Sequence, residues 1–415
     1  MPPKTSDALV DPLISLKKDF LDNPYPTYAR LREEAPVFWS KKGDYWLVSK
    51  YADANDILRD LSYEKGPPKW KTMDPLIKLL PQLFPNLKQQ FEFRGKSMLQ
   101  QNPPDHTRLR GLVNKAFTPS MISRMRTHIQ DIADKLIDQI EAKKIGEMDL
   151  VSEYAYLLPI TVISEMLGIP EGDREQFKSW SQSLTEALEP TFSLPKIQKA
   201  GKANREIIKY LTPLVEERRK NPQEDLISAL VQAEEAGDKL SYAELLANLI
   251  LLLVAGHETT VNLIGNGTLA LLRNQDQLEL LRSKPELINT AVEEFLRYES
   301  PVQLVRRQCG QDLELGGEKM KEGQSMYLLI GSANHDPEQF QNPEKLDITR
   351  TPNKHLAFGA GIHHCLGFSL AQTEGQIAIN TLINRLPNLK LKNEQLLEVR
   401  KPFALRGMKA IPVGF

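Results

Sequence analysis

Apolar residues recur at helical spacing along most of the chain, and polar residues fill the positions between them. This period of three to four residues predicts a mainly α-helical protein. The segments that carry the helical pattern are residues 24–34, 51–60, 105–117, 120–143, 150–168, 171–189, 196–220, 241–272, 275–283, 285–298 and 366–385.

Strand-like alternation is limited to two short regions. Residues 38–49 predict a hairpin that turns at Lys42-Gly43-Asp44. Residues 302–330 predict two or three further strands, interrupted at Gly316-Gly317 and Gly323. The pattern therefore predicts a helical fold with a small β region.

The segment 241–272 predicts an unusually long and buried helix. Ser241 and Glu244 form the S-x-x-E pattern of a capping box at its start. About 30 helical residues span ~45 Å, enough to cross a whole domain. Its centre, Leu245 to Val254, is almost wholly apolar, as in a helix that is buried on all sides. This apolar run is too short to span a bilayer.

Residues 255–260, AGHETT, interrupt the apolar centre of that helix. Gly256 costs ~1 kcal/mol relative to alanine in a helix, and a buried Glu258 needs a partner or solvent. Threonine hydroxyls can bond back to helix carbonyls and bend the helix. The pattern indicates either one odd turn in a core helix, or a groove where an acid beside a hydroxyl delivers protons.

The second unusual string is FGAGIHHCLG, residues 358–367. Its glycines permit positive φ and close backbone approach. Cys365 stands just before a helical pattern, where backbone N–H groups stabilise a thiolate. The string suits a haem or other soft metal, but a tight turn with a buried cysteine is an alternative. A zinc cluster of His363, His364 and Cys365 is another, although adjacent ligands fit a tetrahedral site poorly.

Composition narrows the functional classes. The 415 residues contain no Gly/Ser tract, charge block or repeat, which predicts one domain over residues 1–415. Such a chain can bury enough surface to enclose a cofactor together with a substrate. The 53 basic and 54 acidic residues argue against a nucleic-acid partner.

With two cysteines there is no disulfide framework, and Cys309 is expected to be a small buried residue. The charged, proline-containing N-terminus predicts neither signal peptide nor membrane anchor, hence a cytoplasmic protein.

The string 358–367 resembles the F-G-x-G-x-H-x-C-x-G haem-binding loop of the cytochrome P-450 family, at every fixed position. The resemblance implies that Cys365 is the axial iron ligand of heme b, where a thiolate favours O–O cleavage. AGHETT is similar to the family's oxygen-binding motif. The resemblance covers roughly residues 20–412, and it places these residues around the haem: Ala255, Phe358, Gly359 and Gly367.

Further segments match the family in order and spacing. Glu294 and Arg297 match its E-x-x-R pair, which shares one helix face, and Arg350 resembles a third member that locks the cysteine loop. The resemblance also implies a set of residues that bind the haem propionates, namely His106, Arg110, Arg307 and His363. Arg306 adjoins Arg307, and the choice between them rests on counting back from QDLEL.

The resemblance implies the mostly helical cytochrome P-450 fold, with haem between the long helix and the cysteine loop. The implied reaction is monooxygenation, which uses dioxygen, two electrons and two protons. Thr259 would hydrogen-bond the dioxygen, and Glu258 would help to bring protons. A haem sensor without turnover and a peroxide-driven hydroxylase are alternatives, but the Glu258-Thr259 pair argues against both.

The expected partners are a small lipophilic substrate, dioxygen and a separate ferredoxin or flavodoxin that supplies electrons; the protein is expected to be a monomer without membrane or nucleic-acid partners. Expected pocket walls are residues 62–104, 190–195, 302–305 and the helix face of Ala247, Ile250, Leu251 and Val254. Fatty acids, terpenoids, steroids and polyketides all fit. Arg108, Lys115 and Lys354 would meet an acidic electron carrier, or are ordinary solvated charges.

Overall fold

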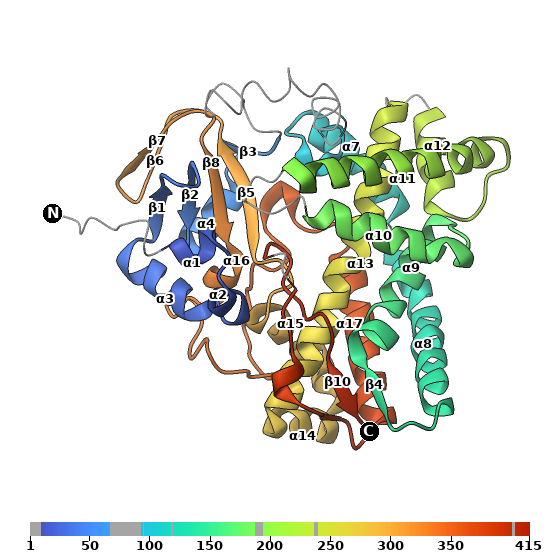
Figure 1. Ribbon diagram of the computed structural model, residues 1–415. Coiled ribbons are helices and arrows are strands. Elements are labelled where there is room, and N and C mark those ends of the chain that lie inside the picture. Colours follow the sequence, from blue (N-terminus) through green and yellow to red (C-terminus); the bar gives the residue numbers. More distant parts are fainter. Residues whose placement is uncertain are drawn as a thin grey trace.

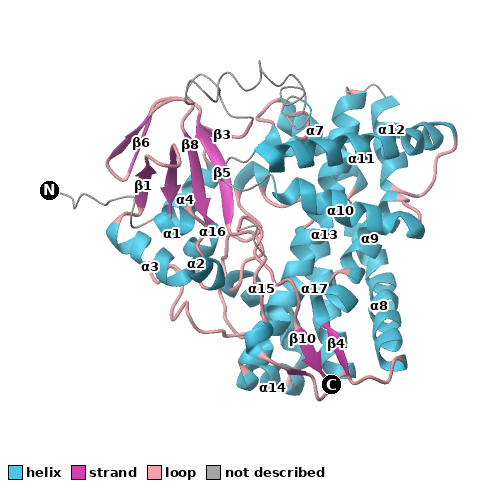
Figure 2. Ribbon diagram, viewed as in Figure 1, coloured by secondary structure: helices cyan, strands magenta, loops and turns pink. Residues whose placement is uncertain are grey.

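The structure is a computed structural model that describes residues 10–66, 93, 95–117, 119–186, 194–235, 240–400 and 403–415. Helices fill most of the molecule, and the strands gather mainly at one side (Figures 1 and 2). The prediction of a mainly helical fold with a small β region is therefore confirmed.

Each predicted helical segment contains an observed helix. The helices are α1 (Asp11–Ile14), α2 (Lys18–Asp22), α3 (Tyr25–Glu34), α4 (Tyr51–Arg59), α7 (Asp105–Ala116), α8 (Pro119–Ala142), α9 (Leu157–Leu167), α10 (Arg174–Thr185), α11 (Leu194–Lys220), α12 (Leu226–Glu235), α13 (Tyr242–Arg273), α14 (Gln275–Ser283), α15 (Ile288–Tyr298), α16 (Ile330–Ala333) and α17 (Phe368–Arg385). The prediction missed α12 and the short helices α1, α2 and α16, whose few turns depend on tertiary packing.

The strands are β1 (Val37–Ser40), β2 (Tyr45–Val48), β3 (Tyr63–Glu64), β4 (Glu147–Asp149), β5 (Leu304–Cys309), β6 (Leu313–Leu315), β7 (Glu318–Met320), β8 (Ser325–Leu329), β9 (Lys390–Leu391) and β10 (Pro412–Gly414). The main sheet has the order β1-β2-β8-β5-β3. The predicted hairpin is confirmed, with Trp39 opposite Trp46.

Residues 302–330 form four strands, more than the two or three predicted. The additional strand arises because β6 and β7 pair with each other in a separate two-stranded sheet. Their turn lies at Gly316-Gly317, where both residues have positive φ, 58° and 82°. Glycine adopts this conformation without the steric cost that other residues carry.

Helix α13 forms the centre of the helical part. Its capping box is present: the Ser241 side chain accepts from the Glu244 N–H, and the Glu244 carboxylate accepts from the Ser241 N–H. By length and composition α13 could cross a membrane, but 72% of its apolar window is buried inside the protein. Its apolar residues therefore belong to the core, where α13 packs against α9, α15 and α17.

Two glycines allow the helices that carry the site to approach closely. A Cβ on Gly267 of α13 would lie 2.8 Å from Phe295 Cδ2 of α15 and 3.1 Å from Ile379 Cδ1 of α17. A Cβ on Gly375 of α17 would lie 2.9 Å from Leu263 Cδ2 of α13. These contacts fix α15 and α17 against α13. They thereby position Glu294 and Arg297 on α15 and the loop of residues 358–367 that leads into α17.

We predict that Gly267→Val destabilises the protein by roughly 1–3 kcal/mol, because the added atoms overlap a filled core. The measurement is urea unfolding followed by circular dichroism. Gly111 of α7 is the control, since a Cβ there meets nothing within 4 Å. Gly111→Ala should raise stability by about 0.5–1 kcal/mol. Wild-type stability in Gly267→Val would contradict the close packing described.

Candidate active site

The cysteine loop is held in place by its glycines and by backbone hydrogen bonds. Gly359 and Gly361 both have φ of 68°. A Cβ on Gly361 would lie 2.4 Å from the Leu58 carbonyl oxygen, so only glycine allows the loop to lie against the end of α4. The Cys365 N–H donates to the Phe358 carbonyl at 2.8 Å and closes the loop. Helix α17 begins at Phe368, three residues after the cysteine.

Electrostatics within the chain alone favour the protonated thiol of Cys365. Burial raises the pKa of the Cys365 thiol, while the Gly367 N–H and the Arg110 guanidinium lower it to a smaller extent. A metal bound to the sulfur would supply the positive charge that a buried thiolate needs, and would thus displace the proton.

Basic side chains, two arginines and two histidines, converge beside this loop. The rings of His106 and His363 lie 4.2 Å apart, centroid to centroid. The Arg110 guanidinium donates to the Ile362 carbonyl at 3.1 Å. Burial lowers the pKa of Arg307 to about 10. Burial and the neighbouring Lys65, Arg307, His106 and Arg110 together lower the pKa of His363 to about 2.

This cluster lacks negative charge. Among the described residues, neither Arg110 nor Arg307 forms an ion pair with an acidic side chain. The Nδ1 atom of His106 is buried without a hydrogen-bond partner. The buried Arg307 guanidinium and the buried Nδ1 atom of His106 need partners, so the cluster fits a ligand with carboxylate groups, as the two propionates of haem provide.

The same contacts favour Arg307 over its neighbour as the propionate residue. Arg306 is satisfied within the chain, since it donates to the Gly66 carbonyl at 2.9 Å and to Ser325 Oγ at 2.8 Å. Arg307 is 3% exposed, and its hydrogen bond is to the Arg306 carbonyl. Its remaining N–H groups suit a carboxylate.

Helix α13 is buried along its middle except for one stripe. Leu251, Val254 and Thr259 are half-buried there, and Ala255 is exposed. These positions recur every three or four residues and so share one helix face. An exposed alanine at the centre of a core helix marks a space that a flat group can fill.

The AGHETT segment remains helical throughout. The Thr259 hydroxyl donates to the Ala255 carbonyl at 2.9 Å, and the Thr260 hydroxyl lies 3.4 Å from the Gly256 carbonyl. A Cβ on Gly256 would lie 3.1 Å from Ile163 Cγ1 of α9. The glycine therefore permits close packing of α9 against α13.

Glu258 lies on a different side of α13, in a buried ion pair. It is 4% exposed, and its Oε2 accepts from Arg400 at 2.8 Å. His257, fully buried, has its Nε2 atom 3.7 Å from Glu258 Oε1. Burial raises the pKa of Glu258, but His257 and Arg400 outweigh it and lower the pKa below its usual value. Sequence reasoning missed Arg400, which no motif marks.

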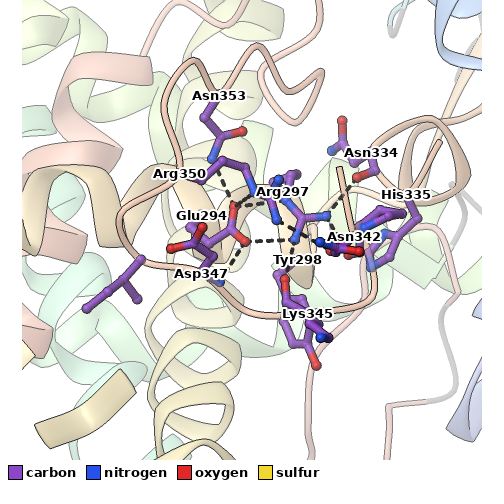
Figure 3. Close-up of polar contacts among 12 residues, drawn as sticks. Glu294, Arg297, Tyr298, Asn334, His335, Asn342, Lys345, Asp347, Arg350 and Asn353 are labelled. Atoms are coloured by element: carbon purple, nitrogen blue, oxygen red, sulfur yellow. Dashed lines mark hydrogen bonds and ion pairs between the residues drawn. The ribbon is translucent and has the colours of Figure 1, made fainter. Parts of the chain in front are cut away.

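The E-x-x-R pair forms the most buried charge network of the described part of the chain (Figure 3). Glu294 and Arg297 are both 0% exposed and form a two-pronged ion pair, with N–O distances of 2.7 and 2.8 Å. Arg350 Nε donates to the same carboxylate at 3.0 Å. The carboxylate also accepts from Asp347 N–H and Asn353 Nδ2.

Arg297 extends this network toward the cysteine loop. It donates to the carbonyl oxygens of Asn334, Pro343 and Lys345, at 3.0, 2.7 and 3.1 Å. The Asn334 side chain in turn accepts from the N–H of Leu356, at 2.7 Å, just before the loop. One carboxylate on α15 thus organises the segment that leads into Cys365.

Two of the residues predicted to meet an electron carrier, Arg108 and Lys354, have different environments in the structure. Arg108 forms ion pairs with Asp105 and Glu244, at 2.9 and 2.7 Å, and so ties α7 to the start of α13. Its charge is used within the chain, whereas Lys354 is exposed. Much of the expected substrate pocket, in residues 67–92 and 187–193, lies outside the described residues.

Comparison with known proteins identifies the class that this fold and site define, a haem-thiolate oxidoreductase. The Cytochrome P-450 family profile matches residues 81–397. Over 405 residues the chain is 42% identical to the polyketide biosynthesis cytochrome P-450 PksS of Bacillus subtilis, covering 96% of this chain and 97% of that protein. The chain therefore belongs to the cytochrome P-450 family.

Solved structures agree with this assignment. The crystal structure of P-450 BioI with hexadec-9Z-enoic acid ligated acyl carrier protein superposes with a TM-score of 0.86 at 40% identity, covering 96% of this chain and 99% of that chain. A myxobacterial cytochrome P-450 in complex with myristic acid gives 0.88 at 37% identity, covering 97% and 99%.

Membership of the family confirms four predictions made from sequence: the family itself, the fold, heme b as the cofactor, and the reaction class. The protein is a monooxygenase that transfers one atom of dioxygen to a lipophilic small molecule, with electrons from a redox partner.

We predict that Glu294→Ala loses roughly 3–5 kcal/mol of stability, because it strands two buried guanidinium groups. Haem incorporation should fall with it, since the segment before the cysteine loop loses its anchor. The measurements are thermal unfolding and the haem content after purification. Glu34→Ala is the control, because Glu34 is 44% exposed and pairs with Arg30, which is 60% exposed, on the surface of one helix; its cost should be about 0–1 kcal/mol. Equal losses in the two variants would refute the special role of Glu294.

Proposed function

We propose that Cys365 is the axial ligand of the haem, and that His106, Arg110, Arg307 and His363 bind its propionates. The observation that carries this assignment is the group of two arginines without acidic partners and two close imidazole rings directly beside the cysteine loop. The haem, when bound, supplies the iron chemistry that activates dioxygen. The chain's own residues bind and orient the reactants, exclude water and move protons.

Thr259 and Glu258 have separate tasks in this proposal. Thr259 lies on the accessible stripe of α13, and its hydroxyl hydrogen is used on the Ala255 carbonyl. Its oxygen remains able to accept a hydrogen bond from a water beside the haem, and the hydroxyl donates to dioxygen once it turns away from the Ala255 carbonyl. Glu258 is ionised and held by Arg400. It can therefore carry protons only when this ion pair opens.

The proposed substrate is an acyl chain of the fatty-acid or polyketide type. Leu251 and Val254 on the accessible stripe of α13 provide an apolar wall that suits such a chain, while Ala247 and Ile250 are buried behind it. Relatives support the choice, since PksS is named for polyketide biosynthesis and the myxobacterial enzyme was solved with myristic acid. The electron donor is proposed to be a ferredoxin or flavodoxin, with the enzyme a cytoplasmic monomer.

Titration of the haem-loaded protein with myristic and hexadecanoic acids tests the substrate class. Displacement of iron-bound water by the acyl chain should change the haem spin state in a saturable manner. A steroid and a terpenoid of similar hydrophobicity serve as comparisons. A spin-state change with these two, and none with either acid, would overturn the proposed class.

We predict that Thr259→Ala uncouples electron consumption from product formation. Substrate binding and reduction do not need the hydroxyl, but ordered proton transfer does, and such transfer contributes roughly 10²–10⁴-fold to a rate. Product per reduced cofactor should fall, and hydrogen peroxide should rise. Both are measured against cofactor oxidised.

Thr260→Ala is the control, because Thr260 is buried and lies off the accessible stripe. It should remain as well coupled as the wild type. Glu258→Gln should slow turnover, since it keeps the shape of the side chain and removes the titratable group. Full coupling in Thr259→Ala would show that substrate or water supplies the hydrogen bond.

A further inference from the structure

The outer face of α11 carries a row of positive charges. Lys199, Lys202, Arg205 and Lys209 recur every three or four residues and are all exposed, so they share one side of the helix. The opposite side is the one that packs into the protein, with these buried residues: Ala200, Ala203, Asn204, Ile207 and Leu211. We call the four exposed residues the basic face of α11.

Two of the four charges, those of Arg205 and Lys209, are not neutralised by an acid in the described part of the chain. The one acid among residues 194–210, Glu206, accepts a hydrogen bond from Trp180 at 2.8 Å and lies 3.8 Å from Lys202. Lys199 is 3.3 Å from Glu186, in an exposed pair that contributes little.

The basic face is a local feature, because the whole chain has a net charge of −1. An ordinary solvated helix surface mixes both signs. Segregated charge of one sign attracts partners of the opposite sign and steers them to one place. The face therefore fits an acidic macromolecule.

Its location suits delivery of substrate. Helix α11 packs against α10 and α12 and also contacts α13. In Figure 1, α10 and α11 cross the upper half of α13. The apolar wall around Ala247 to Val254 lies in the N-terminal half of α13. A partner on the basic face would thus sit outside the layer that covers the proposed substrate wall.

We propose that the basic face of α11 docks an acidic acyl carrier protein, which presents the substrate as a covalently attached acyl chain. The proposal rests on the acyl substrate proposed above. The similarity to P-450 BioI, solved with a loaded acyl carrier protein, agrees with it. Docking and chain insertion then act together, because the docked carrier holds the chain at high effective concentration.

The experiment compares free hexadecanoic acid with a hexadecanoyl chain loaded on a bacterial acyl carrier protein, by haem spin-state titration. In the wild type the loaded carrier should half-saturate at a concentration at least about tenfold lower than the free acid. The quadruple variant K199E/K202E/R205E/K209E should lose this advantage and bind free acid as before. Added salt should weaken only the carrier-loaded titration.

The control variant is K41E/K135E/K319E/K390E, which makes the same change of net charge at exposed lysines elsewhere. It should retain the preference for the loaded carrier. Equal affinity of the wild type for free and loaded acid, or an unchanged preference in the α11 variant, would overturn the proposal. If the α11 variant keeps its preference for the loaded carrier but binds anionic vesicles less tightly than the wild type, the face is assigned to a membrane surface.

A second measurement distinguishes failure of the proposed substrate class from failure of the docking surface. It follows the binding of a fluorescently labelled carrier without an acyl chain by fluorescence anisotropy. If neither form of the acid changes the spin state, salt-sensitive binding of this empty carrier that is lost in the α11 variant still supports the docking surface. Absence of such binding rejects it. The rate of reduction by the electron donor should be equal in both variants and the wild type, and a loss confined to the α11 variant would reassign the face to the donor.

Discussion

The carboxylate of Glu294 is the interaction on which the site most depends. It is completely buried and holds two guanidinium groups, Arg297 from its own helix and Arg350 from the segment before the cysteine loop. Charges buried in this way are costly unless every partner is present. Here the partners include backbone groups from residues 334–347. The network therefore gives the chain ahead of Cys365 one defined path.

The haem site is electrostatically incomplete in the chain alone. Among the described residues Arg110 and Arg307 have no acidic partners, and burial raises the pKa of the Cys365 thiol. In the proposed site the two propionates would supply the negative charge and the ferric ion the positive charge. Because these partners act on the folded chain, haem binding adds to the stability of the fold. The same imbalance explains how a pocket can select a dianionic, metal-containing ligand.

Glu258 and Thr259 show how adjacent residues on a helix acquire different environments. Successive residues point about 100° apart around an α-helix of 3.6 residues per turn. Thr259 therefore lies on the accessible stripe, while Glu258 meets Arg400 in the interior. In the proposed function each group must first give up a partner within the chain, the hydroxyl the Ala255 carbonyl and the acid its ion pair with Arg400.

The sequence by itself determined the features that arise between near neighbours: the capping box of α13, the glycine loop around Cys365 and the Glu294–Arg297 pair. Residues within about four positions meet whenever their helix or turn forms. Only the tertiary structure decided which partners meet across the chain, such as Arg400 with Glu258, Arg108 with Glu244, and Phe295 with Gly267. For the same reason the sequence analysis missed helix α12 and undercounted the strands in residues 302–330, where β6 and β7 form a separate pair. These contacts depend on how whole helices and strands pack, and no local period of apolar residues encodes that arrangement.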